Sequence, residues 1–301
     1  MLFALLPWSW YLVRDLNGRL DIVALAWPVF GVVLAALSWL AAALVRRWTM
    51  VAIAVSWTLC TFAVVVGPWR PLDTGSVRAD GRLRVVAANV LGSRSYPPGV
   101  VRQLDAQHPD LLVVSELPFN ATSIYGQSFR YQVATRHDGH QDVGVFSRYP
   151  LHDLGLPPAL RGQRGRRIEV DGPTGPFILY AMHLQKPGPN PSYVEVGFRT
   201  HRRIIDAIVR SVRAETLPVV VAGDLNLVDR TSGYRALTRV LDDGMRAGWV
   251  GPTSLKRSTK LLLARIDHIF EPSSWCSDSA HTFTISGSDH RGVTTIIGPC
   301  R

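Results

Sequence analysis

Hydrophobic residues follow two different patterns along the chain, and the change lies near residue 70. Residues 22–45 and 50–69 are uncharged and apolar on all sides, and a short basic turn with Arg46, Arg47 and Trp48 separates them. A helix needs roughly 20 apolar residues to cross a membrane, so both segments are long enough. A third apolar run, residues 2–13, is short for a span. We predict a membrane anchor over residues 1–69; two buried core helices are the alternative.

The chain after residue 81 has the pattern of a soluble α/β domain. Short apolar runs alternate with turns and with two helical segments, residues 98–106 and 193–214. The predicted strands are 83–88, 111–115, 131–134, 143–146, 177–182, 218–222, 265–270, 281–285 and 292–297. Several neighbours are too close in sequence for a helical crossover, so mixed or largely antiparallel sheets are expected. We predict a linker over residues 70–81 and one domain over 82–301, a sandwich of sheets with outer helices.

Composition and charge narrow the class of protein. The chain is 47% hydrophobic and 19% charged, which excludes a disordered protein, and its three cysteines exclude a disulfide-dense scaffold. The formal net charge of +10 favours an anionic partner, either nucleic acid, anionic lipid or a phosphorylated substrate. Cys60 lies within a predicted span. Cys276 and Cys300 remain as a pair that can form a disulfide in an oxidising compartment, with two unrelated thiols as the alternative.

The orientation of the anchor has two interpretations. Arg46 and Arg47 in the short turn indicate that the turn is cytoplasmic, and the second span then leads the large domain outward. Arg14, Arg19 and Arg70 lie on the opposite side and favour the reverse orientation. We predict a multi-pass plasma-membrane protein with an extracytoplasmic domain.

Polar residues stand where the predicted strands end. They are Asn89, Glu116, His183, Asp224, Asn226, Asp267, Asp289 and His290. One such residue alone is usually a turn former or a helix cap, but strand ends that meet at one rim can assemble a site. Four carboxylates in one place repel one another, and a hard divalent cation, Mg²⁺ or Mn²⁺, resolves that repulsion. Histidines beside carboxylates are suited to proton transfer, so the set predicts metal-assisted attack of water on phosphorus.

The same residues, in this order and with these gaps, resemble the endonuclease/exonuclease/phosphatase superfamily, the DNase I-like fold. The most specific pieces are Gly223-Asp224-Leu225-Asn226 and Ser288-Asp289-His290, and the resemblance covers roughly residues 83–298. It implies a four-layer sandwich of two sheets flanked by helices, and hydrolysis of a phosphate ester or anhydride. The N-terminal helices resemble the layout of membrane-anchored bacterial members, the teicoplanin-resistance proteins of the VanJ type.

The resemblance implies metal and substrate contacts. Glu116 would be the principal ligand of the Mg²⁺ or Mn²⁺ ion, with Asn89 and Asp289 assisting. Arg148 belongs to a segment, Phe-Ser-Arg-Tyr-Pro, that matches the superfamily's usual pattern, and Lys186 lies in a proline-rich loop that follows a catalytic strand. Both are predicted to contact the substrate.

The resemblance also implies catalytic roles. His290 would be the general base, oriented by Asp267. Asp224 and Asn226 would position water or phosphate and help the leaving group, and His183 would contact the scissile phosphate. The roles of Asp224 and His290 are interchangeable in this scheme.

Three functions are compatible with these observations. A domain held near a membrane meets lipid-linked phosphates at high effective concentration, so a lipid-linked phosphate or pyrophosphate is the favoured substrate. The alternative is a membrane-tethered nuclease or a phospholipid phosphodiesterase. The basic cluster Arg161, Arg164, Arg166 and Arg167 suits a nucleic-acid backbone, although a solvated loop entering a strand explains it as well. A non-catalytic membrane protein is less favoured, because every motif residue is present.

Overall fold

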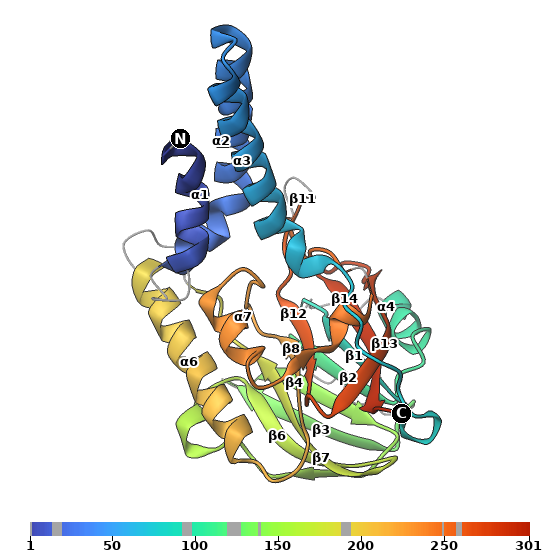
Figure 1. The fold of residues 1–301 in the computed structure, drawn as a ribbon. Helices are drawn as coiled ribbons and strands as arrows, with labels where there is room; N and C mark the ends of the chain where they lie inside the picture. The colour runs from blue at the N-terminus through green and yellow to red at the C-terminus, as the bar shows by residue number, and fades with distance from the viewer. Residues whose placement is uncertain are drawn as a thin grey trace.

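The structure is a computed structural model that describes residues 2–13, 20–91, 98–118, 128–137, 140–187, 194–248, 250–256 and 261–301. Three helices lead the chain, α1 (Leu2–Val13), α2 (Asp21–Val45) and α3 (Trp48–Val65). The antiparallel pair α2 and α3 projects from the rest of the molecule, with α1 beside it (Figure 1). The segments Asp21–Val45 and Trp48–Trp69 have the length and composition of membrane spans, and only 17% and 28% of their most apolar windows are buried. Both predicted apolar helices are confirmed.

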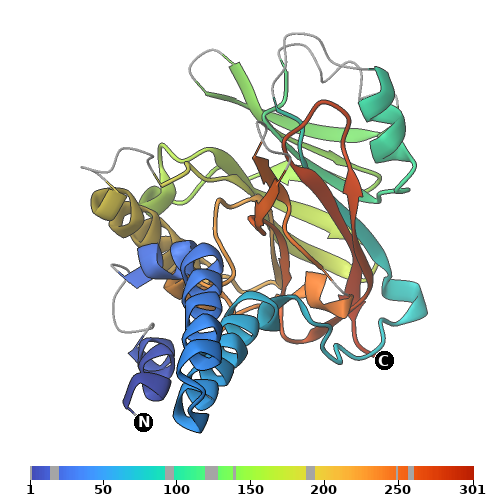
Figure 2. The same cartoon turned by 90° about the horizontal axis from the view of Figure 1, so that it is seen from above.

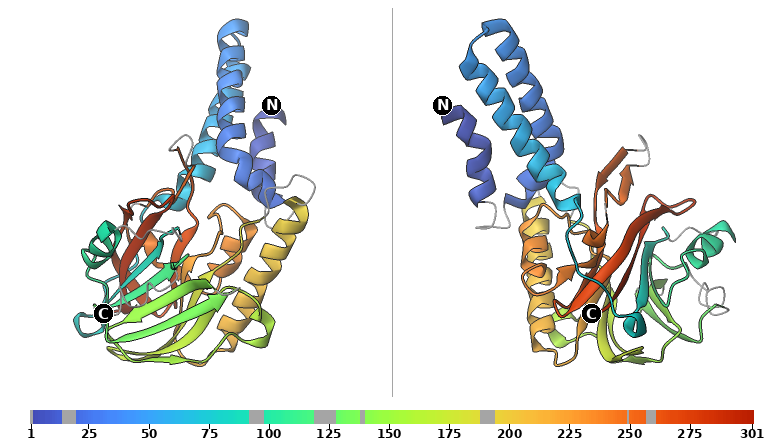
Figure 3. Two further views of the ribbon diagram at one scale, coloured as in Figure 1. Left: turned by 180° about the vertical axis from the view of Figure 1, so that it is seen from behind. Right: turned by 45° about the vertical axis from the view of Figure 1, so that its right-hand side comes forward.

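Two six-stranded sheets form the body of the molecule and pack face to face (Figure 3). The first contains, in chain order, β1 (Leu83–Asn89), β2 (Leu111–Ser115), β3 (Tyr131–His137), β4 (His140–Ser147), β13 (Trp275–Thr284) and β14 (Arg291–Pro299). The second contains β5 (Leu151–Asp153), β6 (Gly165–Gly172), β7 (Gly175–His183), β8 (Val219–Asp224), β9 (Asp242–Asp243) and β12 (Asp267–Glu271). A small separate hairpin joins β10 (Ser254–Lys256) to β11 (Leu261–Ala264).

The pairing within the sheets is mixed, as the close spacing of the strands predicts. The first sheet has the order β13-β14-β1-β2-β4-β3 and the second β5-β6-β7-β8-β12-β9. Within the described strands, β1 pairs with β2 and β7 with β8 in parallel, and the other pairs are antiparallel.

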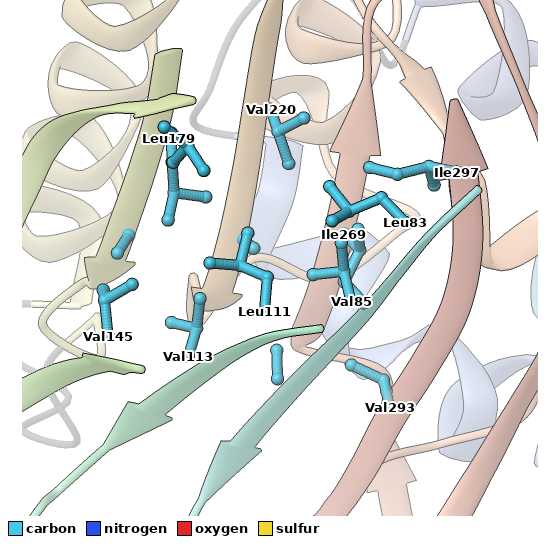
Figure 4. Packing of buried hydrophobic residues seen from close by; sticks show 14 of the residues in the cluster. Leu83, Val85, Leu111, Val113, Val145, Leu179, Val220, Ile269, Val293 and Ile297 are labelled. Carbon is cyan, nitrogen blue, oxygen red and sulfur yellow. The ribbon is translucent and has the colours of Figure 1, made fainter. Parts of the chain in front are cut away.

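The hydrophobic core lies between the two sheets (Figure 4). Successive strand residues point to opposite faces, so Val85 packs into this core whereas Val86 packs outward against α4 (Pro98–Asp105). On the far side, α6 (Val194–Ala214) and α7 (Ser232–Leu237) cover the second sheet through a third cluster that includes Tyr180. The two covering layers lie on opposite outer faces (Figure 2). The predicted four-layer sandwich is confirmed.

Strand β6 and helix α7 are among the elements that the sequence pattern did not predict, together with the short strands β5, β9, β10 and β11. Strand β6 has few apolar residues, and the charged residues among them, including Arg166 and Arg167, obscure the alternation of buried and exposed positions. Helix α7 has six residues, fewer than two turns, which is too short for a helical period to show. Its start is marked instead by Thr231, whose hydroxyl accepts a hydrogen bond from Tyr234 N.

The segment between α3 and β1 packs against the domain. Leu72 N donates to Arg246 O at 2.8 Å, and Val77 forms an isolated bridge with Cys300. Cys300 forms a disulfide with Cys276, so the pair considered from the sequence is bonded. The predicted linker therefore lies along the domain surface, where a hydrogen bond and a β-bridge to a disulfide-bonded residue hold it in place.

Helix α2 also docks on the domain directly. The carboxylate of Asp21, in its first turn, accepts hydrogen bonds from Ser232 N at 2.7 Å and Ser232 Oγ at 2.8 Å. The guanidinium Nε of Arg230 donates to Ala24 O at 3.1 Å. All four residues are buried, so these contacts fix the helix pair relative to the sandwich.

Candidate active site

Seven strands bring polar residues to one rim of the sandwich. The parallel pairs place Asn89 beside Ser115, the residue before Glu116, and His183 beside Asp224. The antiparallel strand β12 starts at this rim and sets Asp267 opposite Asp224. Strands β4 and β14 also begin here, because both run antiparallel to their neighbours. The predicted convergence of strand ends is therefore present.

Asp224 is the centre of the cluster. Asn89 Nδ2 donates to Asp224 Oδ2 at 2.9 Å and to Glu116 Oε1 at 3.0 Å. The Nε2 atoms of His183 and His290 each lie 3.8 Å from the same Asp224 oxygen. Asn89 and Asp224 are buried, whereas the Glu116 side chain keeps 34% of its surface exposed. The cluster thus has a fixed buried floor and an open side at Glu116.

Each of the two imidazoles is held from behind by a further carboxylate. His290 Nδ1 donates to Asp267 Oδ2 at 2.9 Å, and His183 Nδ1 donates to Asp142 Oδ1 at 2.7 Å. A hydrogen bond at Nδ1 fixes the ring and its tautomer, and leaves Nε2 available at the centre of the site. The two His–Asp pairs therefore approach Asp224 in the same way.

Asp142 was missed in the sequence analysis. It stands at the start of an apolar run, whereas the other candidates were found at the ends of runs. Because β4 is antiparallel to β2, its first residues reach the rim that β2 reaches with its last ones. A search for single charged residues at both ends of every apolar run would have found it. Arg164 Nε lies 3.3 Å from the other Asp142 oxygen and extends the pair outward.

The electrostatics of the cluster follow from its buried negative charge. Burial and the negative charge of Asp267 raise the pKa of Asp224 to about 6, against the opposing effect of the two imidazoles. Burial alone would lower the pKa of His290, but the charge and hydrogen bond of Asp267, with Asp224 and Asp289 nearby, raise it to about 10. Burial likewise opposes a charge on His183, yet the neighbouring carboxylates raise its pKa. The site therefore attracts positive charge.

The backbone at Glu116 is strained. Its φ of 53° lies in the left-handed region, which a non-glycine residue adopts at a cost of roughly 1–2 kcal/mol. Leu117 N donates to Asp142 O at 3.1 Å and helps to hold the turn. Strain of this kind collects at functional sites, where the surrounding structure enforces it.

Asn226 shares this conformation, with a φ of 45° that asparagine tolerates better. Its backbone N–H donates to Asp224 Oδ1 at 2.9 Å, and its Nδ2 donates to Leu184 O at 2.9 Å. Asn226 thereby closes the turn after β8 and fixes the second oxygen of Asp224.

The residues present fit a divalent cation. Asp224, Asp267 and His290 each offer a ligand atom, and these atoms lie within 4.8 Å of one another. This group differs from the predicted ligands Glu116, Asn89 and Asp289, which lie around it. Asp267 Oδ1 is buried and, within the described part of the chain, has no hydrogen-bond partner. Asn89 presents its amino group to the carboxylates while its Oδ1 accepts from Leu91 N, so metal binding by Asn89 requires its carboxamide to rotate.

The predicted substrate contacts have different outcomes. Arg148 follows the last residue of β4, at the opposite end of the sheet, where its guanidinium lies 3.7 Å from Asp110. The structure does not bring Arg148 to the cluster, because β4 is antiparallel to β2 and its last residue lies at the opposite end of the sheet. Lys186 is exposed and lines a cavity together with Asn226. Asp289 lies near enough to His290 to raise its pKa. Residues 188–193 of the loop after Lys186 lie outside the described residues.

Solved structures share this fold. A 3′ phosphatase, NExo, from Neisseria with product DNA hairpin is 18% identical, with a TM-score of 0.54 over 71% of this chain and 98% of that chain. An AP endonuclease from Archaeoglobus fulgidus is 16% identical, with a TM-score of 0.53 over 71% and 98% of the two chains. Truncated TDP2 from Caenorhabditis elegans is 14% identical, with a TM-score of 0.54 over 72% and 98%. No curated protein matches by sequence.

A family model completes the comparison. The model of the endonuclease/exonuclease/phosphatase family matches residues 86–290, about two thirds of the chain and nearly all of the sandwich. The matched range begins within β1 and ends at His290, so it spans all the strand ends that build the cluster. The chain belongs to the endonuclease/exonuclease/phosphatase family, whose members hydrolyse phosphate esters.

Proposed function

We propose that this protein is a membrane-anchored, divalent-metal-dependent phosphohydrolase that acts on a lipid-linked phosphate or pyrophosphate. Phosphoester hydrolysis follows from the family. The lipid is inferred from one observation, a cavity of about 330 Å³ between α2, α6 and the turn after β8. Its lining includes Leu25, Pro28 and Val29 of the apolar helix and Asn226 of the catalytic cluster. The cavity thus joins a candidate membrane span to the reacting centre.

The chemistry of the cavity suits an amphiphile. On one side, Leu25 and Val29 are 43% and 71% exposed, and both are available to a hydrocarbon chain. Phe198 and Ile266 continue the apolar lining toward the domain. Lys186 lines the same cavity as Asn226 and supplies a positive charge for the attached phosphate. Each buried methylene contributes about 0.8 kcal/mol, so a short stretch of chain is enough to orient the substrate.

The carboxylates and imidazoles divide the catalytic work in this proposal. Glu116, on the exposed side, is the principal metal ligand, with Asp289 and Asn89 assisting. When bound, a divalent cation polarises the phosphate and offsets the negative charge that now keeps His290 protonated. His290, held by Asp267, then accepts the proton of the attacking water.

The other imidazole and the central carboxylate contact the phosphate in this proposal. His183 Nε2, held in place from Nδ1, donates to a phosphate oxygen. Asp224, whose pKa is raised to about 6, orients the water or serves the leaving group.

A nuclease is the less favoured candidate because three of the four arginines in the basic cluster are ion-paired. Arg167 makes a two-point contact with Glu215, with distances of 2.6 and 2.7 Å. Arg164 and Arg166 lie 3.3 and 3.5 Å from Asp142 and Asp153. Ion-paired arginines in and before a strand do not offer the free positive groove that a phosphate backbone requires.

The disulfide supports an extracytoplasmic catalytic domain. Cys276 and Cys300 are bonded, and disulfides persist in oxidising compartments. The anchor presents its short Arg46-Arg47 turn at the end of the hairpin away from the domain, which agrees with a cytoplasmic turn and an outward domain (Figure 1).

The direct experiment measures phosphate release from a polyprenyl pyrophosphate by the full-length protein in detergent, with added Mg²⁺ or Mn²⁺. We expect release that EDTA abolishes and that His290→Ala reduces by at least a hundredfold. Nicking of DNA without release from the lipid would overturn the proposed substrate and favour the nuclease.

The cavity is tested by filling it. Val29→Trp places a larger side chain in the lining, and Val32→Trp is the control, since Val32 is an exposed α2 residue outside that lining. We expect Val29→Trp to raise KM for the polyprenyl substrate at least fivefold, and to leave hydrolysis of p-nitrophenyl phosphate unchanged. Equal effects of the two substitutions on the lipid substrate would contradict the role of the cavity.

A further inference from the structure

A second cavity lies at the foot of α3 and shares no lining residue with the catalytic cluster. Its volume is about 610 Å³. The last turns of α3 contribute Phe62 and Val64, and the domain contributes residues of α7 and its surroundings. Four arginines complete the lining, namely Arg70, Arg230, Arg235 and Arg246. The cavity is therefore apolar toward the candidate membrane span and strongly basic toward the domain.

The positive charge of this cavity is not balanced by its own acidic residue. Asp229 is the single carboxylate among the residues that line it. Its Oδ2 already accepts hydrogen bonds from Trp69 Nε1 at 2.8 Å and from Arg265 Nε at 3.2 Å. Arg265 does not line the cavity. The negative charge of Asp229 is therefore partly offset by Arg265, and less of it remains for the four arginines of the lining.

Arg230 is buried without full hydrogen bonding. It is 3% exposed, and its Nε donates to Ala24 O. Its Nη1 and Nη2 atoms have no hydrogen-bond partner among the residues that the structure describes, although Nη1 lies 3.7 Å from Asp229 Oδ1. Arg246 Nε is also buried and has no hydrogen-bond partner among the described residues. Unmet donors on buried charged groups are costly, so the cavity is suited to an anion that accepts hydrogen bonds.

We propose that this cavity binds the phosphate group of an anionic phospholipid, whose acyl chains lie along α3. A guanidinium pairs with phosphate through two N–H donors, and Arg230 offers two at its Nη atoms. Phe62, 63% exposed on the adjoining turn of α3, faces the acyl chains. A soluble phosphate would satisfy the arginines but would leave the apolar wall bare, and this favours the lipid. The inference uses the membrane insertion proposed above and is independent of the substrate.

The test compares lipid retention by the full-length protein in dodecyl maltoside, measured by native mass spectrometry with phosphatidylglycerol or phosphatidylcholine. The double variant Arg70→Gln/Arg246→Gln removes two charges from the cavity. Arg210→Gln/Arg213→Gln removes two exposed charges near the C-terminus of α6, which does not line this cavity, and is the matched control. Thermal unfolding and hydrolysis of p-nitrophenyl phosphate show whether each variant is folded. Arg70→Glu, a single change at an exposed residue, serves if the double variant does not fold.

We expect the wild-type protein to retain phosphatidylglycerol at least tenfold more tightly than phosphatidylcholine. The cavity variant should lose this preference about tenfold, and the control should keep it. Equal loss in both double variants, or no loss in either, overturns the proposal. Displacement by glycerol 3-phosphate at equal concentration also overturns it, in favour of a soluble phosphate. Loss of phosphatidylglycerol with retained polyprenyl pyrophosphate hydrolysis separates this site from the catalytic one.

Discussion

Glu116 is the residue at which stability and activity should change in opposite directions. Its side chain is the proposed principal metal ligand, and its backbone is held at a φ of 53°. Replacing it with alanine removes the carboxylate and keeps the strain. Replacing it with glycine removes both. The difference between Glu116→Gly and Glu116→Ala therefore isolates the backbone contribution.

The magnitude follows from two opposing effects. Relief of the left-handed conformation contributes roughly 1–2 kcal/mol, and the extra freedom of glycine in the unfolded chain costs about 0.5–1 kcal/mol. The net gain is roughly 0.5–1 kcal/mol, which in a domain of this size raises Tm by about 1–4 °C. Thermal unfolding is measured in EDTA, because a bound cation would stabilise the wild-type protein alone.

His108 provides the matched control. It has a φ of 50° in an exposed turn after α4 and lies outside the catalytic cluster. We expect His108→Gly to exceed His108→Ala in Tm by a similar amount and to retain full activity, whereas both Glu116 variants lose metal-dependent hydrolysis. A Glu116→Gly protein no more stable than Glu116→Ala would refute the argument from strain. Retained metal-dependent activity would refute the assignment of Glu116 as a ligand.

Three further predictions concern single residues. Asp142→Asn weakens a charged hydrogen bond worth about 1.5–3 kcal/mol and should lower kcat roughly 10- to 100-fold, whereas Asp171→Asn, in an exposed His–Asp pair, should not. Burial raises the pKa of Glu271 from 4.5 to about 8, so the free energy of unfolding should fall as pH rises between these values, by up to about 5 kcal/mol. Glu271→Gln should remove this pH dependence, as measured by chemical denaturation. Cys276→Ser opens a disulfide that spans 24 residues and should cost about 3 kcal/mol, which dithiothreitol should reproduce in the wild-type protein but not in the variant.

The sequence predicts the framework and most of the site because both depend on local patterns. The apolar runs of β1, β2, β7 and β8 predict each strand, and the polar residue at or just after the end of each run then lies at the shared rim. The two apolar helices follow from length and composition in the same way.

What the sequence does not predict depends on strand direction and on packing between distant segments. The contact between Asp142 and His183, and the removal of Arg148 from the site, follow from the antiparallel direction of β4. The docking of Asp21 against Ser232 joins residues 211 positions apart. Both cavities lie where the apolar helices meet the domain, and no local pattern predicts that contact.

The docking of α2 fixes the helix pair relative to the catalytic body. Asp21 and Arg230 fasten the first turn of the helix to the catalytic body, and the following segment is held along the surface. In the membrane-anchored arrangement proposed above, these contacts would hold the catalytic body at one height and one tilt over the bilayer. The proposed lipid substrate would then reach the rim by lateral diffusion, and a phosphate on a longer or shorter spacer would lie at a different level from the rim. In this arrangement the docked helices would hold the site at a fixed distance from the bilayer. Selectivity would then depend on the distance between the phosphate and the hydrocarbon chain.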